Sequence, residues 1–240
     1  MILNGISNKF QLKFKDREAA GNILSESLKT IIKNDERKNT LVLGIPRGGV
    51  ITADIIARKL RCKFDIIIPR KIRAPSNEEI AIGAIMEDGT TYLNEMIVKD
   101  LEISTKYIQD EKLRQLEEIK RRASLYCFEN REYTKLNNIN FSNKTIILVD
   151  DGAATGATII VAARWIRVTK NPRRFIVAIP IAPKYTINLM KHENIDCIEV
   201  ITRPNFNFKS VEQYYKSFNQ VTDEQVIDIL AKYKNDNRIL

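Results

Sequence analysis

The residues best suited to chemistry lie between positions 150 and 158. Two adjacent acids, Asp150 and Asp151, precede the small residues Gly-Ala-Ala and then Thr155-Gly-Ala-Thr158. An apolar run at 145–149 comes before them, and a helical pattern begins at about Gly156. Backbone N–H groups of small residues at a helix N-terminus bind anions, and the two threonine hydroxyls add donors. The stretch 153–158 is therefore predicted to hold a phosphate.

The two acids require a different ligand, because carboxylates repel a phosphate. Adjacent carboxylates suit a pair of vicinal hydroxyls, or a divalent cation that prefers oxygen ligands. A sugar phosphate offers hydroxyls and phosphate together, so Asp150 and Asp151 are predicted to face a sugar. The alternative is an acidic turn that only caps the helix, but capping needs one carboxylate.

The sequence does not indicate other common nucleotide-binding, metal-binding or catalytic motifs. The chain contains neither Gly-x-x-x-x-Gly-Lys-Ser/Thr nor a Gly-x-Gly-x-x-Gly after its first strand, which argues against a P-loop and a dinucleotide-binding domain. Cys62, Cys127 and Cys197 are far apart, and His192 is the only histidine. This pattern favours neither a disulfide framework, a metal knuckle nor a Ser-His-Asp triad.

The elements around the motif predict an α/β fold with a doubly wound, mostly parallel sheet. Short apolar, β-branched runs predict buried strands at 40–45, 65–69, 145–149, 174–179 and 196–201. Helical periodicity predicts helices at 16–33, 50–60, 156–168 and 185–191, and a last one beginning near Asp223. Strand–helix–strand order implies right-handed parallel crossovers, and ligands bind at the carboxyl ends of such strands. The acid pair follows the strand at 145–149 and is therefore expected in the binding crevice.

The middle of the chain has a different character. Apolar runs at 80–86 and 90–93 flank Asp88-Gly89 and predict a β-hairpin. Residues 95–127 predict one or two long helices with acid–base pairs four residues apart, such as Glu118/Arg122, which indicate a solvated helix face. We expect one domain over 1–240, with its core at about 36–200, a flexible loop and hairpin at about 71–94, a helical insertion at about 95–130 and a C-terminal hood at about 202–240.

The stretch from Ile146 to Ile159 resembles the phosphoribosyl pyrophosphate (PRPP) signature of the type I phosphoribosyltransferases. That signature is four apolar residues, two acids, a short linker and Thr-Gly-x-Thr, and each position is met here. Residues 43–49 resemble the family's pyrophosphate loop, and Arg70-Lys71 resembles the basic end of its second strand. Further similarity at Asp16-Arg17, 70–75 and 211–226 extends over nearly the whole chain, to a subgroup described only as predicted phosphoribosyltransferases.

The resemblance implies an enzyme of nucleotide metabolism, which transfers ribose 5-phosphate from PRPP to a nitrogen acceptor, a nucleobase, and releases pyrophosphate with Mg²⁺ as cofactor. It implies catalytic roles for Asp150, Asp151, Lys71 and Arg47, with the two aspartates holding Mg²⁺ weakly, through water. It implies ligand contacts for Arg47, Gly48, Gly49, Lys71, Asp150, Asp151, Gly152, Ala153, Ala154, Thr155, Gly156, Ala157 and Thr158. Ala154 stands where 6-oxopurine enzymes carry an aspartate near the purine, which argues against hypoxanthine or guanine and removes the obvious general base.

Residues after the last strands are expected to roof the acceptor. The candidates are Lys184, Arg203, Phe206, Phe208 and Tyr214. For Tyr214 and Tyr215 a small aromatic core is the favoured interpretation, because aromatic side chains more often pack than bind. Glu78 and Glu79 are expected to be solvated loop residues.

The net charge of +9 leaves other functions open. One alternative is a non-catalytic PRPP-binding regulator with a nucleic-acid partner, and another is phosphoribosyl transfer to an amine or to water. The basic residues Arg164, Arg167, Lys170, Arg173 and Arg174 make a candidate patch, but a solvated face is the favoured interpretation, so nucleic acid is not favoured. No apolar run is long enough for a membrane span and the N-terminus has no signal-peptide pattern, so a cytoplasmic location is expected, with a homodimer as a candidate assembly.

Overall fold

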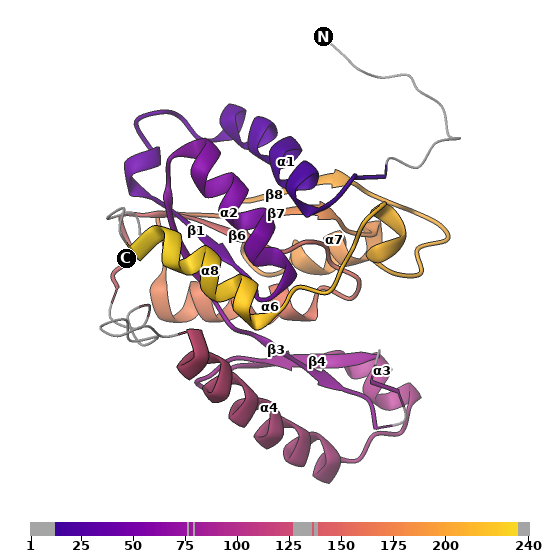
Figure 1. Cartoon of the computed structure of the whole chain (residues 1–240). Helices are drawn as coiled ribbons and strands as arrows, with labels where there is room; N and C mark the ends of the chain where they lie inside the picture. Colours follow the sequence, from indigo (N-terminus) through magenta and orange to yellow (C-terminus); the bar gives the residue numbers. More distant parts are fainter. Residues whose placement is uncertain (1–12, 76, 79, 127–135, 137–138, 235–240) are drawn as a thin grey trace.

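The protein is built on a five-stranded parallel sheet, seen in a computed structural model that describes residues 13–75, 77–78, 80–126, 136 and 139–234 (Figure 1). The strands are β1 (Thr40–Gly44), β2 (Lys63–Ile66), β6 (Thr145–Val149), β7 (Arg174–Ile181) and β8 (Cys197–Thr202). Their order is β2-β1-β6-β7-β8, and every neighbouring pair is parallel. The predicted fold class is confirmed.

Helices cover both faces of this sheet (Figure 1). One face carries α1 (Arg17–Ile31), α2 (Gly48–Leu60) and α8 (Asp223–Lys234), and the other carries α6 (Ala157–Trp165) and α7 (Lys184–Met190). Side chains alternate between the faces: Val42 and Ile147 join the first core, whereas Leu41 and Ile146 join the second. Burial on both faces explains why these strands are continuously apolar in sequence.

The sheet has its topological switch point between β1 and β6. From β1 the chain passes through α2 to β2 on one side, and from β6 it passes through α6 to β7 on the other. At such a point the two connections diverge and leave a crevice outside the strands' carboxyl ends. Residues that follow Gly44 and Val149 therefore line this crevice.

A second, antiparallel sheet contains β3 (Arg70–Arg73), β4 (Ala81–Ile85) and β5 (Thr91–Leu93). The β4–β5 pair confirms the predicted hairpin. The prediction that Arg70 and Lys71 end the second strand is wrong, because β2 stops at Ile66 and both residues open β3. Pro69 has no amide hydrogen for a ladder bond, which helps to end the pairing before the chain enters the second sheet.

Two helices follow the second sheet, α3 (Glu95–Asp100) and α4 (Thr105–Tyr126). Their separation follows from local capping, because the Asn94 side chain accepts from the Ile97 amide at 3.3 Å and Ser104 Oγ accepts from the Tyr107 amide at 3.2 Å. Ile119 of α4 is buried in the same cluster as Ile72 of β3. The inserted helix therefore packs on the second sheet, and the predicted limits at 127 and 130 lie outside the described residues.

The segments at the two ends of the chain lie together. The Phe14 amide donates to the Tyr214 carbonyl at 2.8 Å, and the Lys216 amide donates to the Phe14 carbonyl at 2.8 Å. Phe14, Tyr214 and Tyr215 are buried in one small cluster with Ile181, which confirms the core interpretation of both tyrosines. Short helical turns at Arg37–Asn39 and Glu212–Tyr214 and a π-helix at Ile166–Lys170 complete the described elements. None of the described helices has the length and apolarity needed to cross a membrane.

Candidate functional site

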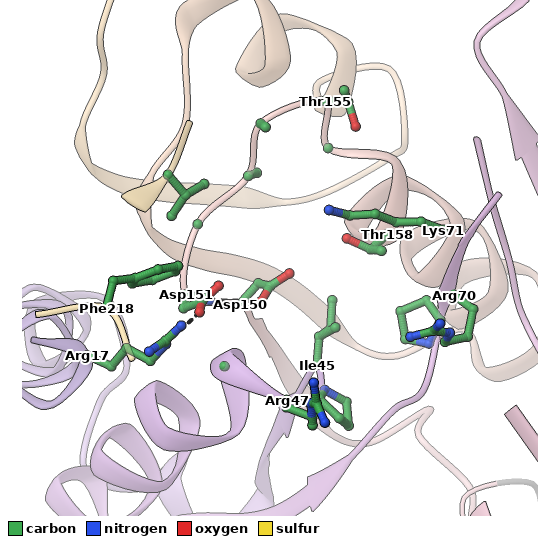
Figure 2. A pocket seen from close by; sticks show the side chains of 18 of the residues that line it. Arg17, Ile45, Arg47, Arg70, Lys71, Asp150, Asp151, Thr155, Thr158 and Phe218 are labelled. Atoms are coloured by element: carbon green, nitrogen blue, oxygen red, sulfur yellow. Dashed lines mark hydrogen bonds and ion pairs between the residues drawn. The ribbon is translucent and has the colours of Figure 1, made fainter. Parts of the chain in front are cut away.

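A cleft of about 400 Å³ lies at the switch point (Figure 2). Its walls come from the ends of β1 and β6, from β3 and α4, and from α1 with the C-terminal segment. Two acids line it, Asp150 and Asp151. The cations that line it are Arg17, Arg47, Arg70, Lys71, Arg73 and Arg122. This excess of positive charge favours a ligand with several negative charges.

The turn before α6 is held in place from outside the cleft. Gly156 has φ 75°, and a Cβ there would lie 2.7 Å from Thr186 Cγ2. The Thr186 hydroxyl donates to the Ala154 carbonyl, and the Ala153 amide donates to the Ile181 carbonyl at 2.9 Å. Within the described residues, the amides of Ala154, Thr155 and Gly156 donate to no protein acceptor. A turn of this kind at a helix N-terminus is suited to an anion.

Asp151 is engaged by an ion pair. Arg17 Nε lies 2.6 Å from Asp151 Oδ2, and the two side chains are only 10% and 14% exposed. The same guanidinium donates to the Asn219 carbonyl at 2.8 Å and lies 3.7 Å from the centre of the Phe218 ring. The Tyr215 hydroxyl donates to the Asp151 carbonyl at 2.6 Å. The second acid therefore joins α1 and the C-terminal segment to the end of β6.

Asp150 points into the cleft, whereas Asp151 points toward Arg17 (Figure 2). Burial raises the pKa of Asp150 well above its usual range, and the neighbouring Asp151 carboxylate raises it further, while Lys71 opposes the shift. Both acids line the cleft, but their side chains differ in direction, and the expectation that both face one sugar stays a prediction. Successive side chains leave the end of a strand on opposite sides, so Asp150 extends into the cleft while Asp151 pairs with Arg17 at its wall.

The loop after β1 approaches both acids closely. A Cβ on Gly48 would lie 1.8 Å from Asp151 Oδ2, and one on Gly49 would lie 2.8 Å from Asp150 Oδ1. The two glycines also open α2, where the first amides of a helix have no internal acceptor. The Pro46–Arg47 peptide bond is cis, and Arg47 Nη1 lies 3.8 Å from Asp223 Oδ1. Glycine at these positions therefore allows the loop to pack on the acid pair.

Most of the predicted site residues meet in this cleft. The residues that line it are Arg47, Gly48, Lys71, Asp150, Asp151, Gly152, Ala153, Ala154, Thr155, Gly156 and Thr158. Gly49 and Ala157 are not among the lining residues; they are buried behind the acids and in the first turn of α6. Lys71 is exposed and makes no ion pair within the described part of the chain.

The predicted acceptor residues do not line the cleft. Phe208 stacks on buried Tyr214 with ring centres 5.8 Å apart, and Phe206 is 84% exposed. Lys184 and Arg203 are exposed and also lie outside it. The C-terminal segment instead contributes Val211, which packs against Gly152, and Phe218. Glu78 forms an exposed ion pair with Arg73 at 2.8 Å, and Glu79 lies outside the described residues.

Arg17 and Arg122 line the cleft, although neither has a predicted role in the site. Arg17 lies in the first turn of α1, where the helix dipole disfavours a cation. An arginine at this position of a helix indicates an acidic partner, so the sequence did contain evidence for the ion pair. Arg122 gave no such signal, because its spacing from Glu118 is the same as in an exposed ion pair. Only packing of α4 on the second sheet brings it to the cleft.

The basic patch predicted at 164–174 is largely neutralised. Arg164 pairs with Glu193 at 2.9 Å and Arg167 with Asp196 at 2.7 Å. Arg173 and Arg174 both approach Glu36, at 3.0 and 3.6 Å. Lys170 Nζ lies 5.5 Å from the centre of the Trp165 ring. This surface therefore gives no specific support to a nucleic-acid partner.

The donor set of the cleft fits an Mg²⁺ ion that is shared with a ligand. No group of three or more His, Cys, Asp or Glu side chains gathers within the described residues. Asp150 offers a carboxylate beside an anion-binding turn. Mg²⁺ is commonly bound by one or two carboxylates, substrate phosphates and water. The residues present are compatible with that mode, in which most ligands come from the substrate.

Fold and cleft together define an α/β protein with a positively charged cleft at its switch point. The chain belongs to the phosphoribosyl transferase family, whose domain model matches residues 11–217, and this places it among the transferases by class. Two relatives from Mycobacterium tuberculosis strains, provisionally named phosphoribosyl transferases, are 31% identical over 223 residues. The match covers 93% of this chain and 47% of those proteins, so the chain spans about half the length of these curated relatives.

A solved structure extends the comparison to the whole fold. The crystal structure of TT1426 from Thermus thermophilus is 32% identical in sequence, with a TM-score of 0.69. The similarity covers 92% of this chain and 99% of that one. The two-sheet arrangement is therefore similar to an experimentally determined one over nearly its full length.

Proposed function

We propose that this chain transfers ribose 5-phosphate from PRPP to a nitrogen nucleophile, a nucleobase or a related base, and releases pyrophosphate. The observation that carries the proposal is the convergence of three parts in one cleft: the anion-binding turn at 154–158, the cleft-facing carboxylate of Asp150 and the group of cations. A phosphate, a sugar diol and a diphosphate are the three groups that PRPP presents.

Each part has a chemical role in this proposal. The amides and hydroxyls of the turn bind the 5-phosphate, and Asp150 accepts hydrogen bonds from the ribose hydroxyls. Arg47 and Lys71 bind the diphosphate. Transfer breaks the bond between C1 and the diphosphate oxygen, forms a bond between C1 and the acceptor nitrogen, and releases a proton from that nitrogen. The charge of Asp150 favours the cationic sugar ring as the bond breaks.

Mg²⁺ bound with PRPP would neutralise charge on the departing diphosphate. Asp150, directly or through water, is the residue placed to hold it. Asp151 is held by Arg17, so its contribution in this proposal is to position its neighbour.

The residues of the cleft exclude some acceptors more clearly than they select one. Ala154 is exposed and offers no carboxylate to a purine, so hypoxanthine and guanine are disfavoured. Phe218 lines the cleft, but Arg17 lies over its ring at 3.7 Å and Tyr215 packs at 4.8 Å between ring centres. An acceptor is therefore expected to contact Val211 and the edge of Phe218 rather than to stack on a free ring.

The test is a transfer assay with PRPP, MgCl2 and a panel of nucleobases, amines and water alone. We expect pyrophosphate release that depends on one acceptor class, with the ribosylated product identified by mass spectrometry and lost in Asp150→Asn. Tight PRPP binding without turnover for any acceptor would favour a PRPP-binding regulator. No binding of PRPP at all would reject the proposal.

A further inference from the structure

Arg122 is a buried arginine of α4 that faces the cleft. The residue is 8% exposed and lines the cleft, although its helix lies on the second sheet. Its Nε donates to Glu118 Oε1 at 2.8 Å. Its two terminal nitrogens have no protein partner within the described residues. The hydrogen bond at Nε orients the guanidinium group, and its two terminal nitrogens can donate to an anion in the cleft.

Arg70 is held in the same manner. Its Nε donates to Gln115 Oε1 at 3.0 Å, and Gln115 in turn donates to Glu111 Oε1 at 2.8 Å. Gln115 and Glu111 are 9% and 6% exposed, so this support is part of the packed interface between α4 and the second sheet. One face of α4 thus orients two arginines through their Nε atoms.

The two guanidinium groups repel one another in the absence of an anion. Burial lowers the pKa of Arg70 to about 10, and the charges of Arg122, Arg73 and Arg47 lower it further, while Glu118 opposes the shift. Glu118 itself binds both Arg121 and Arg122, and these hydrogen bonds lower its pKa to about 2. Glu118 and Asp223 are carboxylates among these cations, with Asp223 Oδ1 3.8 Å from Arg47 Nη1, and Arg47, Arg70, Arg73 and Arg122 still outnumber them. A bound anion with two or more charges would reduce the remaining repulsion.

We propose that Arg70 and Arg122 form a subsite for a diphosphate group, built by the inserted helix α4. Planar guanidinium groups bind phosphate oxygens in pairs, and two of them lining one cleft suit two linked phosphates. That this group is the leaving diphosphate of PRPP rests on the proposed function. The binding of inorganic diphosphate to the subsite is a separate expectation that does not depend on the proposed function.

The chain contains a matched control beside the residue under test. Arg121 also donates to Glu118, with its Nε 2.7 Å from Oε2, and its Nη2 lies 3.6 Å from Asp223 Oδ2, but its side chain is 53% exposed and does not line the cleft. Replacing Arg121 removes one ion pair with Glu118, one with Asp223 and the same charge, and it leaves the guanidinium groups of Arg70 and Arg122 in place. A general effect of charge or of helix stability would therefore affect both variants.

Calorimetry with inorganic diphosphate and, separately, ribose 5-phosphate tests the proposal at fixed ionic strength. For Arg122→Met we expect affinity for diphosphate to fall about tenfold to a hundredfold, the loss of a charge-assisted hydrogen-bonding group. Ribose 5-phosphate should bind within about twofold of the parent chain, since its phosphate belongs to the turn at 154–158. Arg121→Met should bind both ligands within about twofold of the parent.

Arg122→Lys provides a variant that keeps the charge. We expect it to retain part of the affinity for diphosphate, because a lysine keeps the charge but not the planar fork. Unfolding midpoints for all variants show whether each remains folded under the binding conditions. If Arg122→Met unfolds, the lysine variant carries the comparison with Arg121→Lys.

Three results would overturn the subsite: no binding of diphosphate by the parent chain, equal losses in the Arg121 and Arg122 variants, or equal losses for both ligands. These results are distinct from failure of the proposed function. Diphosphate binding that depends on Arg122, without any transfer reaction, would leave the subsite standing and reject only the enzyme. If Arg122→Met catalyses transfer and binds diphosphate as well as the parent chain does, the proposed function would stand and the subsite would be rejected.

Discussion

Arg17 and Asp151, 134 positions apart in the chain, meet through a hydrogen bond of 2.6 Å between Nε and Oδ2. The pair stands behind the cleft wall formed by Gly48, since a Cβ at that position would overlap both side chains. Of two neighbouring acids in one motif, this contact engages Asp151, while the Asp150 side chain extends into the cleft. The two acids should therefore respond differently to substitution.

Asp150→Asn is expected to weaken PRPP binding with little loss of stability, because it removes the acceptor for the sugar hydroxyls. Asp151→Asn is expected to reduce the free energy of unfolding by about 3 kcal/mol, the lower end for breaking a buried pair. Calorimetry with PRPP and urea unfolding of both variants separate the two effects. A loss of PRPP affinity in Asp151→Asn equal to that in Asp150→Asn, at full stability, would show that both acids bind the sugar.

Arg17→Lys should not behave as a conservative change. A lysine keeps the charge but gives up the fork that reaches Asp151 and the Asn219 carbonyl together, and it loses the planar contact with Phe218. We expect a loss of about 1–2 kcal/mol in unfolding free energy by urea denaturation. A double-mutant cycle with Asp151→Asn should then give a clear coupling energy, and simple additivity would argue against the pair.

The pH dependence of sugar-phosphate binding should follow the ionisation of Asp150. Its pKa is raised by burial and by Asp151, so the carboxyl stays protonated at pH values where an ordinary aspartate is charged. PRPP affinity is expected to rise as the pH increases through this raised pKa, and the dependence should vanish in Asp150→Asn. Affinity titrated across this range in both proteins provides the measurement.

The same shift has a consequence for stability with the opposite sign. Between the ordinary pKa of an aspartate, about 3.9, and the raised value, the native chain keeps a proton that the unfolded chain has released. Stability should therefore decrease as the pH rises through that window, and Asp150→Asn should remove this contribution. The unfolding free energies of the parent chain and of Asp150→Asn are compared across this pH window. A difference between them that grows in favour of the parent chain as the pH rises would contradict the assignment.

The turn at Gly156 offers a test of its geometry. Gly156→Ala should cost about 1–2 kcal/mol for a left-handed residue, and more because the added methyl group meets Thr186 Cγ2. Thr186→Ser removes that methyl group and keeps the hydroxyl that donates to Ala154. In urea unfolding, Gly156→Ala/Thr186→Ser should thus recover the part of the loss due to crowding, and Thr186→Ser alone serves as the control. No recovery would show that the backbone conformation accounts for the whole cost.

The main sheet and its motif could be predicted from the sequence because both are local patterns. The apolar run at 145–149, the acids and the Thr-Gly-Ala-Thr turn are contiguous, so their relative placement is fixed by a few backbone angles. The order of strands and helices then indicated which strand ends line the crevice. For the same reason the hairpin around Asp88-Gly89 was predicted correctly.

What could not be predicted depends on contacts between distant segments. The partner of Asp151 comes from α1, and the cation that α4 adds comes from a helix whose charge pattern is that of a solvated face. The predicted acceptor residues lie outside the cleft for a related reason: Val211 and Phe218 line it instead, in a C-terminal segment that is held by hydrogen bonds to Phe14. Contacts between distant segments produce no periodic pattern of residues in the sequence.

The cations of the cleft are divided unequally between the two layers of the molecule. Arg70, Lys71, Arg73 and Arg122 belong to the second sheet and α4, whereas the anion-binding turn and Asp150 belong to the main sheet. A polyanion that touches both layers would act as a removable cross-link, and mass action would make resistance to heat follow its concentration. Diphosphate should therefore protect the chain from thermal unfolding at concentrations where a monovalent anion such as chloride has no effect.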